Sequence, residues 1–192
     1  MKVLVVYAHP NPASFNRALL DAIHEGLATA GHPVRVRDLY QCGFDPVLSR
    51  SDLARLALAD TPEEIRTEQA LVSWAELMIF LYPVWWFGPP ALLKGWFDRT
   101  FTHGFAFRYG PAGHQGLLAP RQAVIVATLG GSAAEYRARD WESLLVRPAA
   151  EGVLGYCGVQ LREARLLYEI PGSSEAARRE MLEQMSELAA SF

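Results

Sequence analysis

The chain has 192 residues, 51% of them hydrophobic, a composition that suits one compact domain with a substantial core. Its 18 lysines and arginines against 21 acidic residues leave a net charge of −3, without the positive field that holds a nucleic-acid backbone. No apolar run approaches the roughly 20 residues that cross a bilayer, so we expect a cytoplasmic protein without membrane insertion. Cys42 and Cys157 form no C-x-x-C pair, which predicts reduced thiols and no metal site.

Segments with the pattern of strands and of helices alternate along the chain. In chain order, we predict a strand at 2–8, a helix at 14–31, a strand at 33–39, a loop at 40–60 with at most one helical turn, a helix at 61–75, a strand at 76–83, a helix at 89–101, strands at 121–131 and 159–169, and a helix at 173–192. The helix at 61–75 is expected to start with Thr61 as its N-cap and Pro62 at its first helical position.

Strands that alternate with helices pair in parallel through right-handed crossovers, which gives a doubly wound α/β sheet. Five strands in a chain of this length favour the flavodoxin-like order 2-1-3-4-5, in a single domain over residues 1–192. Such sheets bind their ligands at the carboxyl ends of the strands. Three loops leave the first, third and fourth strands at this edge, and each has an unusual sequence.

The first loop, AHPNPASFN at 8–16, leads into a predicted helix. Free amides at a helix N-terminus, together with the small polar side chains of Asn11, Ser14 and Asn16, make a site for an anion such as phosphate. The glycine spacings of the dinucleotide fingerprint and of Walker A are absent, which argues against a Rossmann dehydrogenase and a nucleotide triphosphatase. The alternative is that Ser14 is only an N-cap and His9 only a loop histidine bonded to backbone.

The second loop follows the third predicted strand and contains YPVWWFGPP. Its prolines end the strand and start the next helix, and we expect the backbone amides of the turn between them to stay unpaired. Flat aromatic walls beside free amides suit a planar heteroaromatic ring such as an isoalloxazine. Alternatively, Trp85, Trp86 and Phe87 belong to the core or to a subunit interface. Trp96 and Phe97, inside the following helix, are predicted to be packing residues.

The third loop is TLGGSAAEY at 128–136. Gly130 and Gly131 let the main chain approach a ligand closely, and with Thr128 they would hydrogen-bond the polar edge of a bound ring. The alternative is that the two glycines form only a turn. Ser132 lacks the G-x-S-x-G context of an α/β-hydrolase nucleophile, so a hydrolase is not expected.

Four stretches carry a resemblance to a known family: VVYAHPNPASFNRAL, DLYQCGFDPVLS, EQALVSWAELMIFLYPVWWFGPPALLKGWFDRTFTHGFAF and TLGGSAAEY. Together they resemble the flavodoxin-like NAD(P)H:quinone oxidoreductases. Members of that family include DT-diaphorase, the modulator of drug activity, general stress protein 14 and the ancillary flavoprotein of a potassium-efflux system. The resemblance runs from the first strand to beyond Tyr136, in the family's order, and the block from Tyr82 to Phe107 is its most specific part.

The resemblance implies a role for each matching residue. The phosphate and ribityl region of a flavin would be held by His9, Ser14, Phe15 and Asn16, with Gln69 near the flavin. The flavin ring would be lined by Pro83, Val84, Trp85, Trp86 and Phe87 on one side and by Thr128, Leu129, Gly130 and Gly131 on the other, with Tyr136 as the catalytic residue near the reacting edge. The family completes its site across a homodimer, in which Phe105, Phe107 and Tyr109 would cover the substrate.

The resemblance also implies the activity. A non-covalent FMN or FAD would take a hydride from NADPH or NADH, and a quinone or similar acceptor would then occupy the same place and receive two electrons, which predicts ping-pong kinetics. The sequence lacks the long C-terminal extension of the mammalian member, and this favours FMN over FAD. The alternatives are a regulatory flavoprotein that docks on a potassium-efflux transporter, or a flavodoxin-type electron carrier.

One departure from the family concerns the proton relay. In the mammalian member a histidine follows, a few positions later, the tyrosine that matches Tyr136, and here RARDWES follows without a histidine. Arg137, Arg139 or a water molecule would have to stabilise negative charge on the ring in its place. The sequence therefore assigns no relay.

Overall fold

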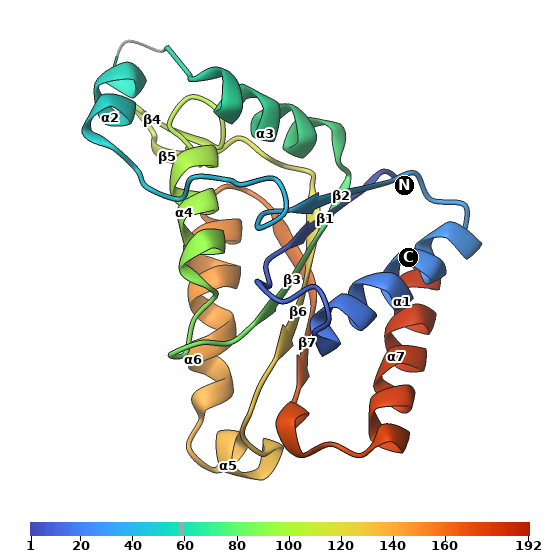
Figure 1. The fold of residues 1–192 in the computed structure, drawn as a ribbon. Coiled ribbons are helices and arrows are strands. Elements are labelled where there is room, and N and C mark those ends of the chain that lie inside the picture. The colour runs from blue at the N-terminus through green and yellow to red at the C-terminus, as the bar shows by residue number, and fades with distance from the viewer. Residues whose placement is uncertain (58–59) are drawn as a thin grey trace.

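The computed structural model of the protein describes residues 1–57 and 60–192 (Figure 1). Its parallel sheet has five strands in the order β2-β1-β3-β6-β7, which confirms the flavodoxin-like order predicted from the sequence. The strands of this sheet are β1 (Val3–Tyr7), β2 (Val34–Asp38), β3 (Leu77–Pro83), β6 (Gln122–Thr128) and β7 (Gln160–Leu167). The helices are α1 (Phe15–Thr29), α2 (Arg50–Ala57), α3 (Glu63–Trp74), α4 (Ala91–Thr100), α5 (Ala133–Ala138), α6 (Trp141–Arg147) and α7 (Glu175–Ala190).

Helices cover both faces of the sheet, with α1 and α7 on one face and α3 and α4 on the other (Figure 1). Successive side chains of a strand point to opposite faces, so β1 feeds both cores. Val3 and Val5 pack with the layer of α1 and α7, whereas Leu4 and Val6 pack with the layer of α3 and α4. This explains why β1 is a continuous apolar run. None of the helices in the described ranges combines the length and apolarity needed to cross a membrane.

A buried carboxylate ties the second of these layers to the sheet. Glu68 of α3 is fully buried, and its Oε2 accepts hydrogen bonds from Nε of Arg37 at 3.1 Å and from Nε1 of Trp96 at 2.9 Å. Trp96 is itself fully buried and Phe97 is 6% exposed, which confirms the prediction that both are packing residues. The three partners come from β2, α3 and α4, so the network fixes how these elements sit against one another.

Helix α2 is longer than the single turn that the sequence predicted for the segment 40–60. Its start is a reciprocal capping box, in which the Ser49 amide donates to Oδ2 of Asp52 at 2.9 Å and the Asp52 amide donates to Oγ of Ser49 at 3.1 Å. Arg99 of α4 then holds Asp52 through an ion pair of 3.2 Å. The Ser-x-x-Asp spacing was present in the sequence and was missed. Residues 58 and 59 of the predicted loop lie outside the described residues.

The predicted start of α3 was wrong by one residue. Pro62, with ψ of 148°, is the N-cap, the helix begins at Glu63, and no side chain caps it. Thr61 lies one position too early, and its carbonyl instead accepts a hydrogen bond of 2.6 Å from Arg66. The acidic residues Glu63 and Glu64 occupy the first turn, where they interact favourably with the helix dipole.

Several short elements were not predicted at all. They are a hairpin of β4 (Phe107–Gly110) and β5 (Gly113–Gly116), the helices α5 and α6, and a π-helical segment at Pro148–Gly155. The strand β5 has the sequence GHQG, which carries no strand propensity. The helices α5 and α6 have six and seven residues, too few to show a helical period.

Candidate functional site

The three unusual loops meet at one edge of the sheet. They follow β1, β3 and β6, which are neighbours in the sheet order, and all three strands run in parallel. Their carboxyl ends therefore lie side by side, as the ribbon in Figure 1 shows. The tertiary fold thus brings most of the sequence-predicted site residues to one place.

The first loop is held by its own polar side chains. Ser14 is the N-cap of α1 and its Oγ accepts from the Arg17 amide at 3.3 Å. Nδ1 of His9 lies 3.0 Å from the Asn11 amide nitrogen and 3.2 Å from the Asn11 carbonyl oxygen, so the imidazole is bonded to the backbone of its own loop. Partial burial lowers the pKa of His9. Both local roles raised as alternatives, an N-cap and a backbone-bonded histidine, are therefore present.

Asn16 supplies the clearest sign of a ligand in this loop. It is 3% exposed, and no partner for its Nδ2 exists in the described part of the chain. A buried donor without an acceptor destabilises the chain, so native proteins usually pair such a group with a ligand or water. Asn16 lies in the first turn of α1, where backbone amides also point outward. This donor set fits a phosphate or a polyhydroxyl chain.

The second loop is a tight turn with strained aromatic residues, called here the aromatic turn (Trp85–Gly88). Trp85 and Gly88 exchange backbone hydrogen bonds of 2.9 and 3.1 Å, and the two central residues, Trp86 and Phe87, have φ of 49° and 60°. Positive φ at both positions defines a type I′ turn, which normally takes glycine or asparagine. Two large aromatic residues there indicate strain kept for a functional reason.

The amides of this loop are only partly free, which corrects the expectation from the sequence. The Val84 amide donates to the Thr128 carbonyl at 2.8 Å, and the Trp85 amide is used within the turn. The reason is that the loop closes on itself and on β6. Only the amides of Trp86 and Phe87 lack a backbone partner among the described residues. The Trp86 side chain is 98% exposed, so it belongs to no core in the single chain.

Rings from the first and third loops flank the aromatic turn. The Trp85 and His9 ring centroids are 6.4 Å apart, and the Phe87 ring lies 6.1 Å from that of Tyr136 and 5.1 Å from that of Trp141. The turn thus joins the first loop to the third through aromatic contacts, and its three aromatic residues are 40% exposed or more. This arrangement offers flat walls to a planar ring.

The third loop has one open and one crowded glycine. A Cβ at Gly130 would meet nothing within 4 Å, whereas a Cβ at Gly131 would lie 2.8 Å from Cε2 of Tyr136. Gly131 is therefore required for the position of the Tyr136 ring. Leu129 is 2% exposed, and its amide and carbonyl bond Leu167 and Ile170. Of the predicted residues here, Leu129 has the least freedom to contact a ligand.

Four predicted site residues lie away from the three loops in the single chain. The Nε2 of Gln69 donates to the Thr100 carbonyl and to Oγ1 of Thr102, at 3.1 Å each, at the far end of α4. Phe105, Phe107 and Tyr109 follow this end as well. The helix α4 has ten residues, so about 15 Å of helix separates them from the aromatic turn.

Around Phe107 and Tyr109 the structure brings further aromatic rings together. This set is called here the hairpin cluster (His103, Phe107, Tyr109, His114 and Tyr156). The Tyr109 and Tyr156 hydroxyls are 2.6 Å apart, and the rings of His114 and Tyr156 have centroids 3.7 Å apart. Tyr109 is 64% exposed. The chain therefore presents two separate exposed aromatic surfaces.

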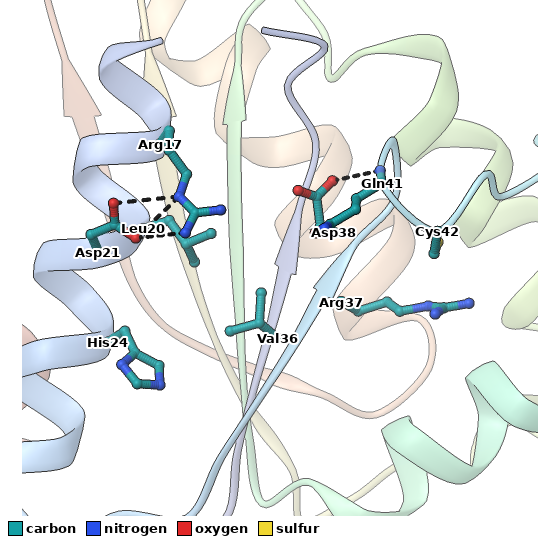
Figure 2. A pocket seen from close by; sticks show the side chains of 9 residues that line it. All are labelled: Arg17, Leu20, Asp21, His24, Val36, Arg37, Asp38, Gln41 and Cys42. Atoms are coloured by element: carbon teal, nitrogen blue, oxygen red, sulfur yellow. Dashed lines mark hydrogen bonds and ion pairs between the residues drawn. The ribbon is translucent and has the colours of Figure 1, made fainter. Parts of the chain in front are cut away.

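A charged groove runs beside the site along the edge strand β2. It encloses about 490 Å³ and is lined by Arg17, Leu20, Asp21, His24, Val36, Arg37, Asp38, Gln41 and Cys42 (Figure 2). In Figure 2 the guanidinium of Arg17 turns to the carboxylate of Asp21, with which it forms an ion pair of 3.0 Å. Arg17 is thus engaged within α1 and is not a free cation of the first loop.

Sequence reasoning missed several side chains of the site. The rings of Trp141 and Tyr168 contact that of Tyr136, Glu142 bonds Tyr168, and Arg178 of α7 lies with its Cζ 5.7 Å from the centre of the Phe15 ring. Trp141 could have been found as an aromatic residue shortly after Tyr136, but Arg178 and Tyr168 carry no local signal.

Neither arginine proposed as a substitute for the family's histidine is unpaired. Arg137 forms an ion pair of 3.1 Å with Glu142, and Arg139 one of 3.7 Å with Glu135. Each guanidinium therefore has its charge balanced by a carboxylate within the α5–α6 corner.

Comparisons with known proteins agree with this geometry. A family model described as a flavodoxin-like fold matches residues 1–189. NAD(P)H dehydrogenase (quinone) 1 of Cavia porcellus is 37% identical over 201 residues, which cover 94% of this chain and 73% of that protein. The solved structure of an NAD(P)H:quinone oxidoreductase from Methanothermobacter marburgensis has a TM-score of 0.91 at 28% identity and covers 99% and 98% of the two chains. General stress protein 14 of Treponema denticola, in complex with FMN, has a TM-score of 0.70 at 25% identity over 100% and 97% of the chains.

Proposed function

Because the chain belongs to the flavodoxin-like NAD(P)H:quinone oxidoreductase family, we propose that it is a flavin-dependent NAD(P)H dehydrogenase that passes two electrons to quinones or similar acceptors. One observation carries this proposal. The buried unpaired Nδ2 of Asn16 and the strained, exposed aromatic turn lie at the same edge of the sheet. A phosphate site beside flat aromatic walls is what a flavin nucleotide needs.

The residues of the first loop would hold the flavin's phosphate and ribityl chain. Phosphate would lie at the N-terminus of α1, where the helix dipole and the free amides of the first turn stabilise negative charge. The side-chain Nδ2 of Asn16 is a further donor, and the imidazole of His9 would contact the same region of the flavin. The complex of the Treponema denticola protein with FMN supports FMN as the flavin, and FAD remains the other form to test.

The aromatic turn and the third loop would hold the flavin ring. The free amides of Trp86 and Phe87 can donate to its carbonyl and nitrogen edge, and Gly130 leaves room for close approach of the main chain. When bound, the flavin supplies hydride acceptance from NAD(P)H and two-electron reduction of the acceptor. The protein orients both substrates in turn on one exposed ring face and excludes water with its aromatic side chains.

A homodimer would complete the site. In one chain the hairpin cluster lies at the opposite end of α4 from the aromatic turn, so neither aromatic surface is covered. In a two-fold dimer, each chain would place Phe105, Phe107 and Tyr109 over the turn of its partner. Gln69, at the same end of α4, would approach the partner's flavin in the same way. The large exposed aromatic surface at each end supports this arrangement.

The test begins with the colour of the native protein. We expect flavin absorbance in the purified protein, release of FMN or FAD on denaturation, and sustained turnover of NADH or NADPH when a quinone is added. Initial rates at varied concentrations of both substrates should give the parallel reciprocal lines of a ping-pong mechanism. A colourless protein that binds neither FMN nor FAD would overturn the proposal.

A matched variant ties flavin binding to the first loop. Asn16→Ala removes the unpaired donor, so the apoprotein should keep its stability while its affinity for FMN falls about tenfold, the effect of one lost hydrogen bond to a charged group. Fluorescence titration of FMN measures the affinity. Equal affinity of the variant and the natural chain would show that Asn16 does not contact the flavin.

A further inference from the structure

A carboxylate in α6 joins three segments of the chain. Oε1 of Glu142 in α6 accepts a hydrogen bond from the Tyr168 hydroxyl, just past the end of β7, and another of 3.1 Å from Nε of Arg137 in α5. Burial, followed by the bond to Glu142, raises the pKa of Tyr168, so its hydroxyl stays protonated and donates. Glu142 thus links the corner formed by α5 and α6 to the sheet.

This corner has little else to hold it. None of the residues of α5 is buried, and in α6 only Leu145 is. Asp140, between the two helices, has a left-handed φ of 53°, which a residue with a side chain adopts at some cost. Short helices without a buried face depend on tertiary contacts to stay formed. The bonds of Glu142 and the ring contacts of Trp141 supply those contacts.

The corner carries the rings that face the aromatic turn. The Tyr136 ring lies edge to face against Tyr168 at 5.9 Å and against Trp141 at 5.5 Å, and Trp141 in turn contacts Phe87 at 5.1 Å. Tyr168 therefore has two roles in one side chain, since its ring supports Tyr136 and its hydroxyl fixes Glu142. A shift of Glu142 would displace Tyr136 and Trp141 together.

We propose that Tyr168 and Glu142 are positioning residues, which hold Tyr136 and Trp141 as a rigid wall of the flavin and substrate site. This inference rests on the proposed function for its consequence in turnover. Because Arg137 and Tyr168 bind the same oxygen of Glu142, the role is geometric, and an uncharged acceptor at this position should serve nearly as well. If the negative charge of Glu142 were required instead, Glu142→Gln would be as impaired as Glu142→Ala.

The test compares Glu142→Ala, Glu142→Gln and Tyr168→Phe with the natural chain. The control is Glu151→Ala, which breaks the exposed Arg147–Glu151 pair in the next segment of the chain and leaves the site untouched. The first readout is hydrogen–deuterium exchange of residues 133–147 in the flavin-free protein. We expect Glu142→Ala and Tyr168→Phe to speed exchange about tenfold, as loss of one hydrogen bond to a carboxylate allows. We expect Glu142→Gln and the control to leave it near the natural rate.

The second readout is steady-state turnover of the flavin-loaded protein. Glu142→Ala and Tyr168→Phe should raise KM for the nicotinamide or the quinone by about threefold to tenfold with a smaller change in kcat, because the wall that orients the substrates is loosened. Glu142→Gln should restore most of the loss.

Two outcomes would overturn the inference. One is unchanged exchange and unchanged KM in both Glu142→Ala and Tyr168→Phe, and the other is a Glu142→Gln variant as impaired as Glu142→Ala. The exchange experiment needs no flavin, so a natural chain that binds no flavin would refute the proposed function without deciding whether these residues hold the corner.

Discussion

At the scale of single residues, the aromatic turn is where stability and function conflict. Trp86 and Phe87 hold left-handed backbone conformations, which cost about 1–3 kcal/mol each for residues with side chains. Trp86 recovers none of this by burial, since it is 98% exposed. Its side chain is therefore placed for a contact that the single chain does not make, with a flavin, a substrate or a partner subunit.

Replacing Trp86 should separate these two effects. Trp86→Gly removes the strain and should stabilise the fold by about 1 kcal/mol, while kcat/KM falls about tenfold because one flat wall is lost. Trp86→Ala is the matched control, since it loses the same wall but keeps a Cβ at positive φ. Thermal unfolding and steady-state kinetics measure both effects. A Trp86→Gly variant that is less stable than the natural chain would show that the ring itself supports the fold.

At the scale of elements, the packing of α3 and α4 on β2 depends on the buried Glu68. Glu68→Ala leaves the Arg37 guanidinium and the Trp96 indole without their acceptor and should destabilise the fold by about 3–5 kcal/mol. Glu68→Gln keeps an acceptor oxygen and should cost less. Glu151→Ala, at an exposed ion pair, should leave stability nearly unchanged, because solvent screens such pairs. Urea unfolding compares the three, and a loss no larger in Glu68→Ala than in the control would contradict this account.

The attachment of α2 to α4 should weaken in acid. Burial alone would raise the pKa of Asp52, but hydrogen bonds from Ser49 and Arg99 outweigh it, and the pKa lies below its usual 3.8. A depressed native pKa gives stability that is complete above the unfolded value and is lost as pH falls through the native value. At pH 7 Asp52→Asn should therefore be less stable by about 2 kcal/mol.

The pH dependence of this difference shows whether the charged form of Asp52 is responsible for it. The difference in unfolding free energy between the natural chain and Asp52→Asn should hold down to about pH 5 and shrink below the usual value of 3.8. Urea unfolding at a series of pH values measures it. A difference that grows as the pH falls would show that the charged form of Asp52 does not stabilise the fold.

At the scale of the whole molecule, the two exposed aromatic surfaces are the basis of the proposed dimer. The aromatic turn and the hairpin cluster lie at opposite ends of α4, and a two-fold axis would bring each against the other in a second chain. A site shared in this way contains residues from both subunits, so its defects can be complemented between chains.

Trp86→Ala and Phe107→Ala should each lower turnover, and each should remain folded. When the two variants are co-expressed and a mixed dimer is isolated, one of its sites carries both changes and the other carries neither. That dimer should recover about half of the natural activity, as expected for one intact site of two. Two wild-type chains tagged and purified in the same way are the control. A mixed dimer with only the mean activity of the two variants would place both residues in one chain's site.

The fold and the position of the site were accessible from the sequence for a definite reason. A strand buried on both faces has to be a continuous apolar run, as β1 is, and a parallel sheet has to place its loops at one edge. The Pro-Val-Trp-Trp-Phe-Gly-Pro-Pro sequence at 83–90 also marks a turn without any tertiary information. The capping box at Ser49 and Asp52 is also a local signal, but the sequence prediction did not use it.

The sequence by itself thus determined the fold class, the edge of the sheet that carries the site and the loops that build it. Only the tertiary structure decided which side chains are free to act. It paired Arg137 with Glu142, left Nδ2 of Asn16 without an acceptor in the described part of the chain, and put Gln69 at the wrong end of α4 for its own chain's site. The reason is that a local pattern shows only which positions of one helix or strand are buried. Partners such as Tyr168 and Glu142 are 26 residues apart, and they meet only when the segment after β7 packs against α6.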